Sequence, residues 1–266
     1  MDQAWLDKKR NLKFCKHHTA LSSSEGCSII IFPEMTLTGF APEEDIAENI
    51  ADSYTLKSFR NLALNQDINI IFGASLRQSN ESLPSNMLCL ARTSAVVEPI
   101  YSKIHPFSYS KENNYTNNGN NIEIQNISGL NIGFAICYDL RFPEIFSIMS
   151  KSCDIIVIIA NWPSQRISHW RTLLTARAIE NQCYFIGVNR VGIDGNGVEY
   201  ENSSMVVSPS GSVLSPDFSA GLLEVYDVDA KIVKDYRKNF PTIQDKRSDL
   251  YIQLYKILLK QYNNIK

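Results

Sequence analysis

Three residues in this sequence carry side chains suited to nucleophilic chemistry, and each stands just past a run of apolar residues. Cys137 supplies a thiol, which is mostly protonated at neutral pH and needs a base and a positive environment to act as a nucleophile. Glu34 supplies a carboxylate that can be that base. Lys103 supplies a cation that can stabilise the oxyanion formed when a thiolate attacks a carbonyl group. These residue types predict attack of a thiol on a carbonyl carbon.

The segments that precede these residues are expected to bring them together. The apolar runs Cys27–Phe32, Val96–Tyr101 and Leu130–Ile136 predict strands. Strand ends on one edge of a sheet converge in space, so the three polar residues that follow them are expected to meet. After the cysteine, Pro143 can occupy the first turn of a short helix, because its missing N–H costs nothing there. The start of that helix would add positive potential.

The rest of the chain alternates between helical and extended patterns. Helices are expected over 2–22 and 169–182, the second with Ser168 as its N-cap, and a buried strand over 153–162. An Asn-rich stretch over 105–125 predicts a long surface loop of the kind that carries function. Hairpin-like segments interrupt the alternation, which favours a layered α/β sandwich over a doubly wound sheet.

Composition narrows the class of protein. An apolar content of 44% and a charged content of 20% fit a globular protein with a sizeable core. The net charge of -2, with scattered basic residues, offers no positive stripe for nucleic acid. Residues 1–10 lack the apolar core of a signal peptide, and no apolar run reaches membrane-spanning length, so a cytoplasmic protein without membrane contact is expected.

The six cysteines stand singly, with no Cys/His cluster at metal-ligand spacing. Neither a metal site nor a disulfide framework is expected, and five of the six can be small buried hydrophobes. No Pro/Gly/Ser-rich linker divides the chain, so one domain is expected over residues 1–251. Apolar residues at helical spacing predict an amphipathic tail over 252–266, which could dock on its own subunit or on a partner.

Each of the three candidate residues also has an ordinary structural explanation. A glutamate after Phe-Pro is more often a solvated turn residue than a base. Lys103 alone would more often be a surface charge, and Cys137 alone would more often be a packing residue at a strand end. The catalytic interpretation depends on finding the three together in flanking sequences that share one chemistry.

Those flanking sequences resemble the nitrilase, or carbon-nitrogen hydrolase, superfamily, which carries a Glu-Lys-Cys triad. The matching segments are Phe32–Met35, Tyr101–His105 and Cys137–Glu144. The resemblance continues to about residue 251, and its later segments look like the omega-amidase branch, which deaminates 2-oxoglutaramate and 2-oxosuccinamate. These later segments are Ala160–Pro163, His169–Trp170, Ala176–Gln182, Asn189–Gly192 and Gly211.

The resemblance implies a four-layer α-β-β-α sandwich, no cofactor and a homodimer. It implies that Glu34 is the general base, Lys103 the oxyanion stabiliser and Cys137 the nucleophile that forms a thioester and expels ammonia. The backbone N–H of Tyr138 would complete the oxyanion hole. Family members carry a second active-site glutamate on the loop after the lysine motif, and Glu112 is the nearby acid that matches.

Other polar and aromatic residues near these segments are candidates for binding a small amide substrate. Asn161 and Trp162 end the strand after the nucleophile's helix and are expected to line the substrate pocket, although Trp162 could instead be core. Arg141 is a further candidate for substrate binding, with a structural alternative in which it pairs with Glu144 at i,i+3. Two further residues, Arg177 and Glu180, are expected to pair in the same way, and His169 to cap or pack.

One departure from the family pattern concerns the first sheet. Members of the superfamily begin with a hydrophobic strand before the segment that corresponds to Gln3–Lys8, and this strand is expected to be missing here, which would expose a neighbouring strand edge. Two alternatives to an omega-amidase stay open, and the missing strand motivates only the second. One is an N-carbamoyl amide or nitrile hydrolase with the same triad, and the other is a catalytically impaired member with a binding role.

Overall fold

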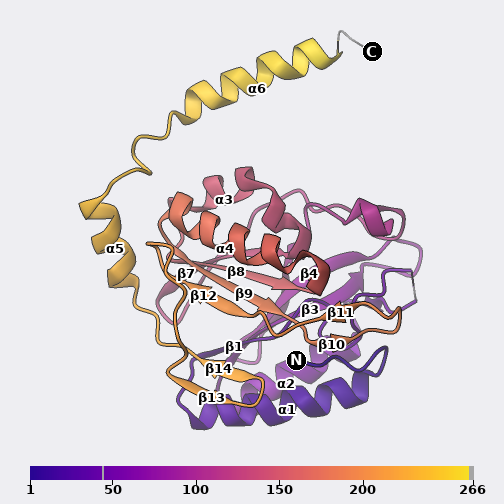
Figure 1. The fold of residues 1–266 in the computed structure, drawn as a ribbon. Helices are drawn as coiled ribbons and strands as arrows, with labels where there is room; N and C mark the ends of the chain where they lie inside the picture. The colour runs from indigo at the N-terminus through magenta and orange to yellow at the C-terminus, as the bar shows by residue number, and fades with distance from the viewer. Residues whose placement is uncertain (44, 264–266) are drawn as a thin grey trace.

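The computed structural model describes residues 1–43 and 45–263, and it places two β-sheets face to face between two pairs of helices (Figure 1). Helices α1 (Lys8–Ser24) and α2 (Tyr54–Gln66) cover the outer face of one sheet. Helices α3 (Pro143–Met149) and α4 (Ile167–Asn181) cover the outer face of the other. This arrangement confirms the predicted four-layer α-β-β-α sandwich.

The first sheet is built from the N-terminal half of the chain. Its strand order is β1-β3-β4-β5, in which β1 is parallel to β3, and the pairs β3–β4 and β4–β5 are antiparallel. Strand β2 pairs in parallel with the far end of β3. The strands are β1 (Ile29–Ile31), β2 (Glu48–Asn49), β3 (Asn69–Arg77), β4 (Ser85–Ala91) and β5 (Val97–Ser102).

The second sheet has the order β12-β9-β8-β7-β6, in which the three central strands are parallel and the two edge strands antiparallel. Its strands are β6 (Ile124–Ile127), β7 (Leu130–Ile136), β8 (Ile155–Ala160), β9 (Tyr184–Asn189) and β12 (Met205–Val207). All six residues of β8 are buried, because its two faces are covered by the other sheet and by helices. A small hairpin, β10 (Gly192–Ile193) with β11 (Glu199–Tyr200), lies between β9 and β12 in the chain. A second hairpin, β13 (Phe218–Ala220) with β14 (Leu223–Val225), and helix α5 (Ala230–Asn239) follow β12.

Two clusters of buried side chains hold these layers together. The larger cluster fills the space between the sheets and beneath α3 and α4, and includes Leu88 and Tyr101 of the first sheet with Phe134 and Val157 of the second. The smaller cluster lies between the first sheet and the α1–α2 pair. Burial of this apolar surface is the main stabilising contribution to such a fold.

Several predicted element boundaries were wrong. Helix α1 begins at Lys8, because Asp7 caps it by accepting a hydrogen bond from the N–H of Arg10. Helix α4 begins at Ile167, so Ser168 lies inside the first turn and does not cap it. The loop over 105–125 contains two 3-10 turns, η1 (Ser108–Ser110) and η2 (Glu112–Asn114).

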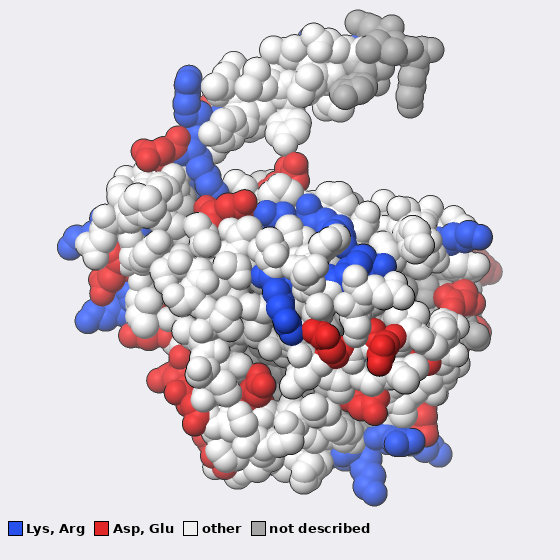
Figure 2. Space-filling model, in the orientation of Figure 1, with Lys and Arg blue, Asp and Glu red and all other residues white. Residues whose placement is uncertain are grey.

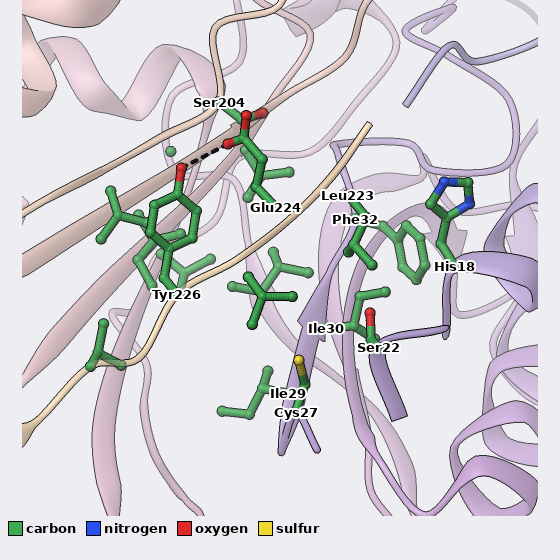
Figure 3. A pocket seen from close by; sticks show the side chains of 18 of the residues that line it. His18, Ser22, Cys27, Ile29, Ile30, Phe32, Ser204, Leu223, Glu224 and Tyr226 are labelled. Carbon is green, nitrogen blue, oxygen red and sulfur yellow. Dashed lines mark hydrogen bonds between the residues drawn. The ribbon is translucent and has the colours of Figure 1, made fainter. Parts of the chain in front are cut away.

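The strand edge expected to be exposed borders a cavity. Among the described residues β1 pairs with β3 alone, and its other edge faces a hollow of about 450 Å³. Figure 3 shows Ile29 and Phe32 on one side of this hollow and Tyr226 and Glu224 on the other. The first sheet is therefore open at β1.

The C-terminal segment differs from the sandwich in its surroundings. Helix α6 (Ser248–Asn263) stands away from the four layers (Figure 1), and its large apolar residues are about half exposed. The predicted tail over 252–266 is thus most of a helix that begins at Ser248, and its last three residues lie outside the described part. No helix in the described ranges combines the length and the apolar character needed to cross a bilayer.

Gly73 of β3 provides a test of how the first sheet positions the segment after β1. A Cβ at this position would stand 2.4 Å from the Met35 nitrogen and 2.8 Å from the Glu34 Cα, so no side-chain rotation can relieve the clash. We expect Gly73→Ala to lower the free energy of unfolding in urea by about 1–3 kcal/mol.

The matched control is Gly133→Ala in β7, where the added Cβ would meet the Cys153 sulfur at 2.8 Å and the Met149 sulfur at 3.2 Å. These are side-chain atoms, and the methionine can shift. A larger loss of stability for Gly133→Ala than for Gly73→Ala would contradict this account.

Candidate active site

The ammonium group of Lys103 lies between two carboxylates in the interior. Its Nζ is 3.0 Å from Oε1 of Glu34 and 2.9 Å from Oε2 of Glu112. All three side chains are essentially inaccessible to solvent, with exposed fractions of 1%, 0% and 0%. The structure therefore brings together three of the residues singled out in the sequence, including the one on the Asn-rich loop.

Three separate elements deliver these groups. Glu34 follows β1 by three residues, as the strand-end argument requires. Lys103 follows β5, and its backbone N–H donates to the Asn86 carbonyl at 2.9 Å, which continues the sheet pairing by one residue. Glu112 opens the 3-10 turn η2, and the loop folds inward so that its side chain is buried.

Neutral donors satisfy the remaining carboxylate oxygens. The amide of Asn86 donates to Glu34 at 2.7 Å and to Glu112 at 2.9 Å. The backbone N–H of Asn161 donates to Oε2 of Glu34 at 2.9 Å, and that of Phe107 donates to Oε2 of Glu112 at 2.6 Å. Buried charges persist only where such partners exist, so each acid is held in one orientation.

The pKa of Lys103 reflects the balance of these contacts. Burial by itself would lower it, but the negative charges of Glu112 and Glu34 outweigh burial and raise the pKa above its ordinary value. The lysine is therefore protonated at neutral pH.

Cys137 stands at the end of β7, where the strand passes into the 3-10 helix η3 (Cys137–Arg141). Its φ of +47° lies in the left-handed region, which a non-glycine residue enters at a cost of about 1–2 kcal/mol. Such strain is commonly found at functional sites. The turn is fixed by Asp139, whose Oδ2 accepts hydrogen bonds from the Ile136 N–H at 3.0 Å and the Tyr101 hydroxyl at 2.7 Å.

The electrostatic environment of this cysteine differs from the expected one. Burial and then the charge of Glu34 raise the pKa of the Cys137 thiol well above its usual value, and the nearby Lys103 only partly offsets them. The helix expected to add positive potential, α3, does begin at Pro143, but η3 separates it from the cysteine. The resting side chain is therefore a thiol.

A cavity of about 530 Å³ opens over these groups. Its wall includes Lys103 and Cys137 together with every residue that the sequence placed at the substrate: Tyr138, Arg141, Asn161 and Trp162. Its volume lies in the usual range for small-molecule sites. The four residues share this wall because η3 and the segment after β8 lie side by side at the carboxyl ends of parallel strands.

The structure decides in part between the structural and substrate-binding interpretations of Arg141 and Trp162. Arg141 makes no ion pair with Glu144 among the described residues; its guanidinium lies 4.7 Å from the Trp162 ring and 3.4 Å from Nδ1 of His169. Trp162 is both buried core and cavity wall, with its indole N–H donating to the Arg166 carbonyl. The i,i+3 pair Arg177–Glu180 is confirmed, at 3.1 Å.

Sequence reasoning missed three positioning residues. They are Asn86, which bridges the two glutamates, Asp139, which fixes the cysteine turn, and Asn189, whose side chain holds both the N–H and the carbonyl of Trp162. Each is a polar residue next to or inside an apolar strand. A polar side chain at a position where burial is expected is the signal that could have identified them.

Comparison with known proteins decides the family. The model of the family described as "Carbon-nitrogen hydrolase" matches residues 1–238. The chain belongs to this family. It is a hydrolase that acts on carbon-nitrogen bonds other than peptide bonds, of the amidase kind.

Relatives cover most of this carbon-nitrogen hydrolase. The chain is 35% identical over 245 residues to "Omega-amidase YafV" of Escherichia coli strain K12, and the matched region covers 91% of this chain and 92% of that protein. It is 28% identical over 232 residues to "2-oxoglutaramate amidase" of Bacillus subtilis strain 168, which spans 86% of this chain and 88% of the relative.

Solved structures share the fold. The CN-hydrolase superfamily protein XC1258 of Xanthomonas campestris matches with a TM-score of 0.82 and 28% identity, over 92% of this chain and 94% of the other. An amidase from Nesterenkonia sp. AN1 matches with a TM-score of 0.80 and 21% identity, over 95% and 96% of the two chains, a likeness that concerns the fold alone.

Asn86 allows a test of the buried ion cluster by charge. Asn86→Leu removes the donor shared by the two glutamates, and we expect a loss of kcat/KM of roughly tenfold or more, in line with about 1–3 kcal/mol for an unsatisfied buried group. Asn86→Asp should cost more, because it adds a third negative charge beside Glu34 and Glu112.

The assay is steady-state ammonia release from an amide, and the control is Asn49→Leu, whose side chain donates to Asn80 and to no other described residue, far from the cluster. Equal activity of Asn86→Leu and Asn86→Asp would show that charge at this position does not matter.

Proposed function

We propose that this chain hydrolyses the terminal amide of small 2-oxo dicarboxylate monoamides, such as 2-oxoglutaramate and 2-oxosuccinamate, to the acid and ammonia. The observation that carries the proposal is that Cys137 and Lys103 line one cavity, while Glu34 is buried beside them with its carboxylate 3.0 Å from the Lys103 ammonium. The choice of substrate is supported by relatives named omega-amidase and 2-oxoglutaramate amidase.

In the proposed first half-reaction Glu34 removes the proton from the Cys137 thiol as the sulfur attacks the amide carbonyl carbon. The carbonyl oxygen becomes an oxyanion, which the Lys103 ammonium and the Tyr138 backbone N–H stabilise. That N–H belongs to the first turn of η3, where N–H groups have no partner within the helix. The proton on Glu34 then passes to the leaving nitrogen, the C–N bond breaks, and ammonia departs from a thioester.

In the second half-reaction water attacks the thioester carbonyl while Glu34 takes a proton from the water. The C–S bond breaks, the acid leaves, and the sulfur regains its proton. Glu112 would hold the lysine in place during both steps, since its carboxylate is 2.9 Å from the ammonium. Asn161, Trp162 and Arg141, which line the same cavity, would bind the substrate.

A substrate panel and two substitutions test this proposal. Cys137→Ala should abolish ammonia release while leaving thermal unfolding cooperative, and Lys103→Ala should lower kcat by about 100-fold or more, the loss typical of an oxyanion donor. Cys27→Ala, a cysteine outside this cavity, should leave turnover unchanged.

The panel comprises 2-oxoglutaramate, asparagine, an N-carbamoyl amine and a nitrile. Faster turnover of a carbamoyl compound or nitrile than of 2-oxoglutaramate would favour the alternative activity within the same family. Full activity of Cys137→Ala, or no ammonia from any compound, would refute the thiol amidase proposal and leave the impaired, binding member.

We also propose that the chain forms a homodimer in which helix α6 is a contact. Seven apolar side chains between Tyr251 and Leu259 are each 47–61% exposed, and the face of α6 visible in Figure 2 carries almost no charge. Together they form an exposed apolar face of the kind that protein–protein interfaces bury. A single domain over 1–251 and a cytoplasmic location stay predictions of the sequence.

Light scattering after size-exclusion chromatography tests the dimer. Leu254→Asp combined with Leu258→Asp should shift the full chain from dimer to monomer, because two carboxylates cannot be buried there without partners. Gln253→Asp, which adds a charge to the same helix without removing an apolar side chain, should leave the dimer intact. A wild-type monomer at micromolar concentration would refute the proposal.

A further inference from the structure

Two arginine side chains line the cavity that opens over the buried ion cluster. Arg141 comes from the end of η3 and Arg166 from the end of η4 (Ser164–Arg166), and both line the cavity that contains Cys137. Figure 2 shows Lys and Arg side chains gathered over this region of α4. Both arginines are half-buried, so neither is an ordinary solvated surface charge.

Neither guanidinium has a carboxylate partner within residues 1–43 and 45–263. By contrast, nearby Arg171 pairs with Glu201 at 2.9 Å, and Arg177 pairs with Glu180. The acids on the cavity wall are Glu43, which is exposed, and Asp194. Asp194 is already engaged, because its oxygens accept from the Tyr200 hydroxyl and from the N–H groups of residues 196 and 198.

Aromatic rings fix where the two positive charges stand. The Arg166 guanidinium lies 5.6 Å from the centre of the Phe107 ring, and that of Arg141 lies 4.7 Å from the centre of the Trp162 ring. The Phe107 ring in turn packs 4.9 Å from that of Tyr138. Contacts of this kind orient a guanidinium while leaving its N–H edge available for hydrogen bonds. Burial, and to a smaller degree the charge of Arg166, lower the pKa of Arg141, so the two cations sense each other.

We propose that Arg166 is a specificity-determining residue that, with Arg141, binds the carboxylate at the end of the substrate remote from the scissile amide. Two fixed guanidinium groups that repel each other and pair with no acid among the described residues are matched by one carboxylate, which can accept from both. The inference rests on the proposed amidase function and names the second residue that would select an anionic amide over a neutral one. Arg166 acts on binding and takes no part in bond breaking.

The experiment compares Arg166→Gln, Arg166→Lys and the control Arg171→Gln, an exposed arginine from the neighbouring turn of α4 that pairs with Glu201. With 2-oxoglutaramate, Arg166→Gln should raise KM tenfold or more and change kcat less than threefold, while KM for the neutral amide butanamide stays within twofold. Arg166→Lys should recover part of the loss, because it restores charge without the planar fork. Arg171→Gln should behave as wild type.

A binding measurement keeps this inference separate from the proposed function. Calorimetric titration of 2-oxoglutarate, the product, into the Cys137→Ala protein should give a Kd that Arg166→Gln weakens tenfold or more, whether or not the wild type turns over. Unchanged KM and Kd in Arg166→Gln, or an equal rise of KM for the neutral amide, would overturn the assignment of Arg166. Absence of ammonia release with arginine-dependent binding of 2-oxoglutarate would refute the amidase proposal and support the anion site.

Discussion

Two buried carboxylates share one ammonium group, and most of the site depends on that arrangement. Lys103 has no solvent contact and lies within 3.0 Å of both Glu34 and Glu112, so its charge is stabilised only if both acids are in place. Removing one partner of such a buried pair typically costs about 3–5 kcal/mol, because the remaining charge has no compensation. The end of β1, the end of β5 and the loop over 105–125 must therefore adopt one mutual position.

The cluster of two carboxylates and one ammonium group carries a net negative charge, and this charge influences whether the Cys137 side chain is protonated. In a low-dielectric interior a thiolate next to that charge would be costly, which is why the pKa of Cys137 is raised by burial and by Glu34. A negative sulfur is then expected only as its proton moves onto Glu34. In the proposed mechanism, protonation of Glu34 and attack on the carbonyl would then be one coupled event, which would keep a reactive thiolate from accumulating when no substrate is bound.

The sequence predicted the layers and the convergence of the main candidate groups because apolar runs define strands and strand ends meet at a sheet edge. Glu112 required resemblance to a family, since nothing in a polar loop reveals that its side chain will be buried. The sequence could not show which groups Asn86 and Asp139 contact. Asn86 donates to glutamates that are 26 and 52 positions away, and Asp139 fixes a turn whose geometry is set by packing. Ser168 failed as a cap because the 3-10 turn η4 leads directly into α4 and starts the helix two residues earlier than expected.

The site lies at the junction of the two sheets, and hydrogen bonds across that junction link their packing to the chemistry. Glu34, from the first sheet, accepts from the backbone N–H of Asn161 at the end of β8 in the second. Tyr101 of β5 donates to Asp139, which fixes the turn of the cysteine after β7. Glu34 and Cys137 thus belong to different sheets, and the side chains that fill the space between those sheets set their separation. Because well-packed interiors resist small displacements, this apolar layer helps to fix the position of the Cys137 sulfur relative to the Glu34 carboxylate.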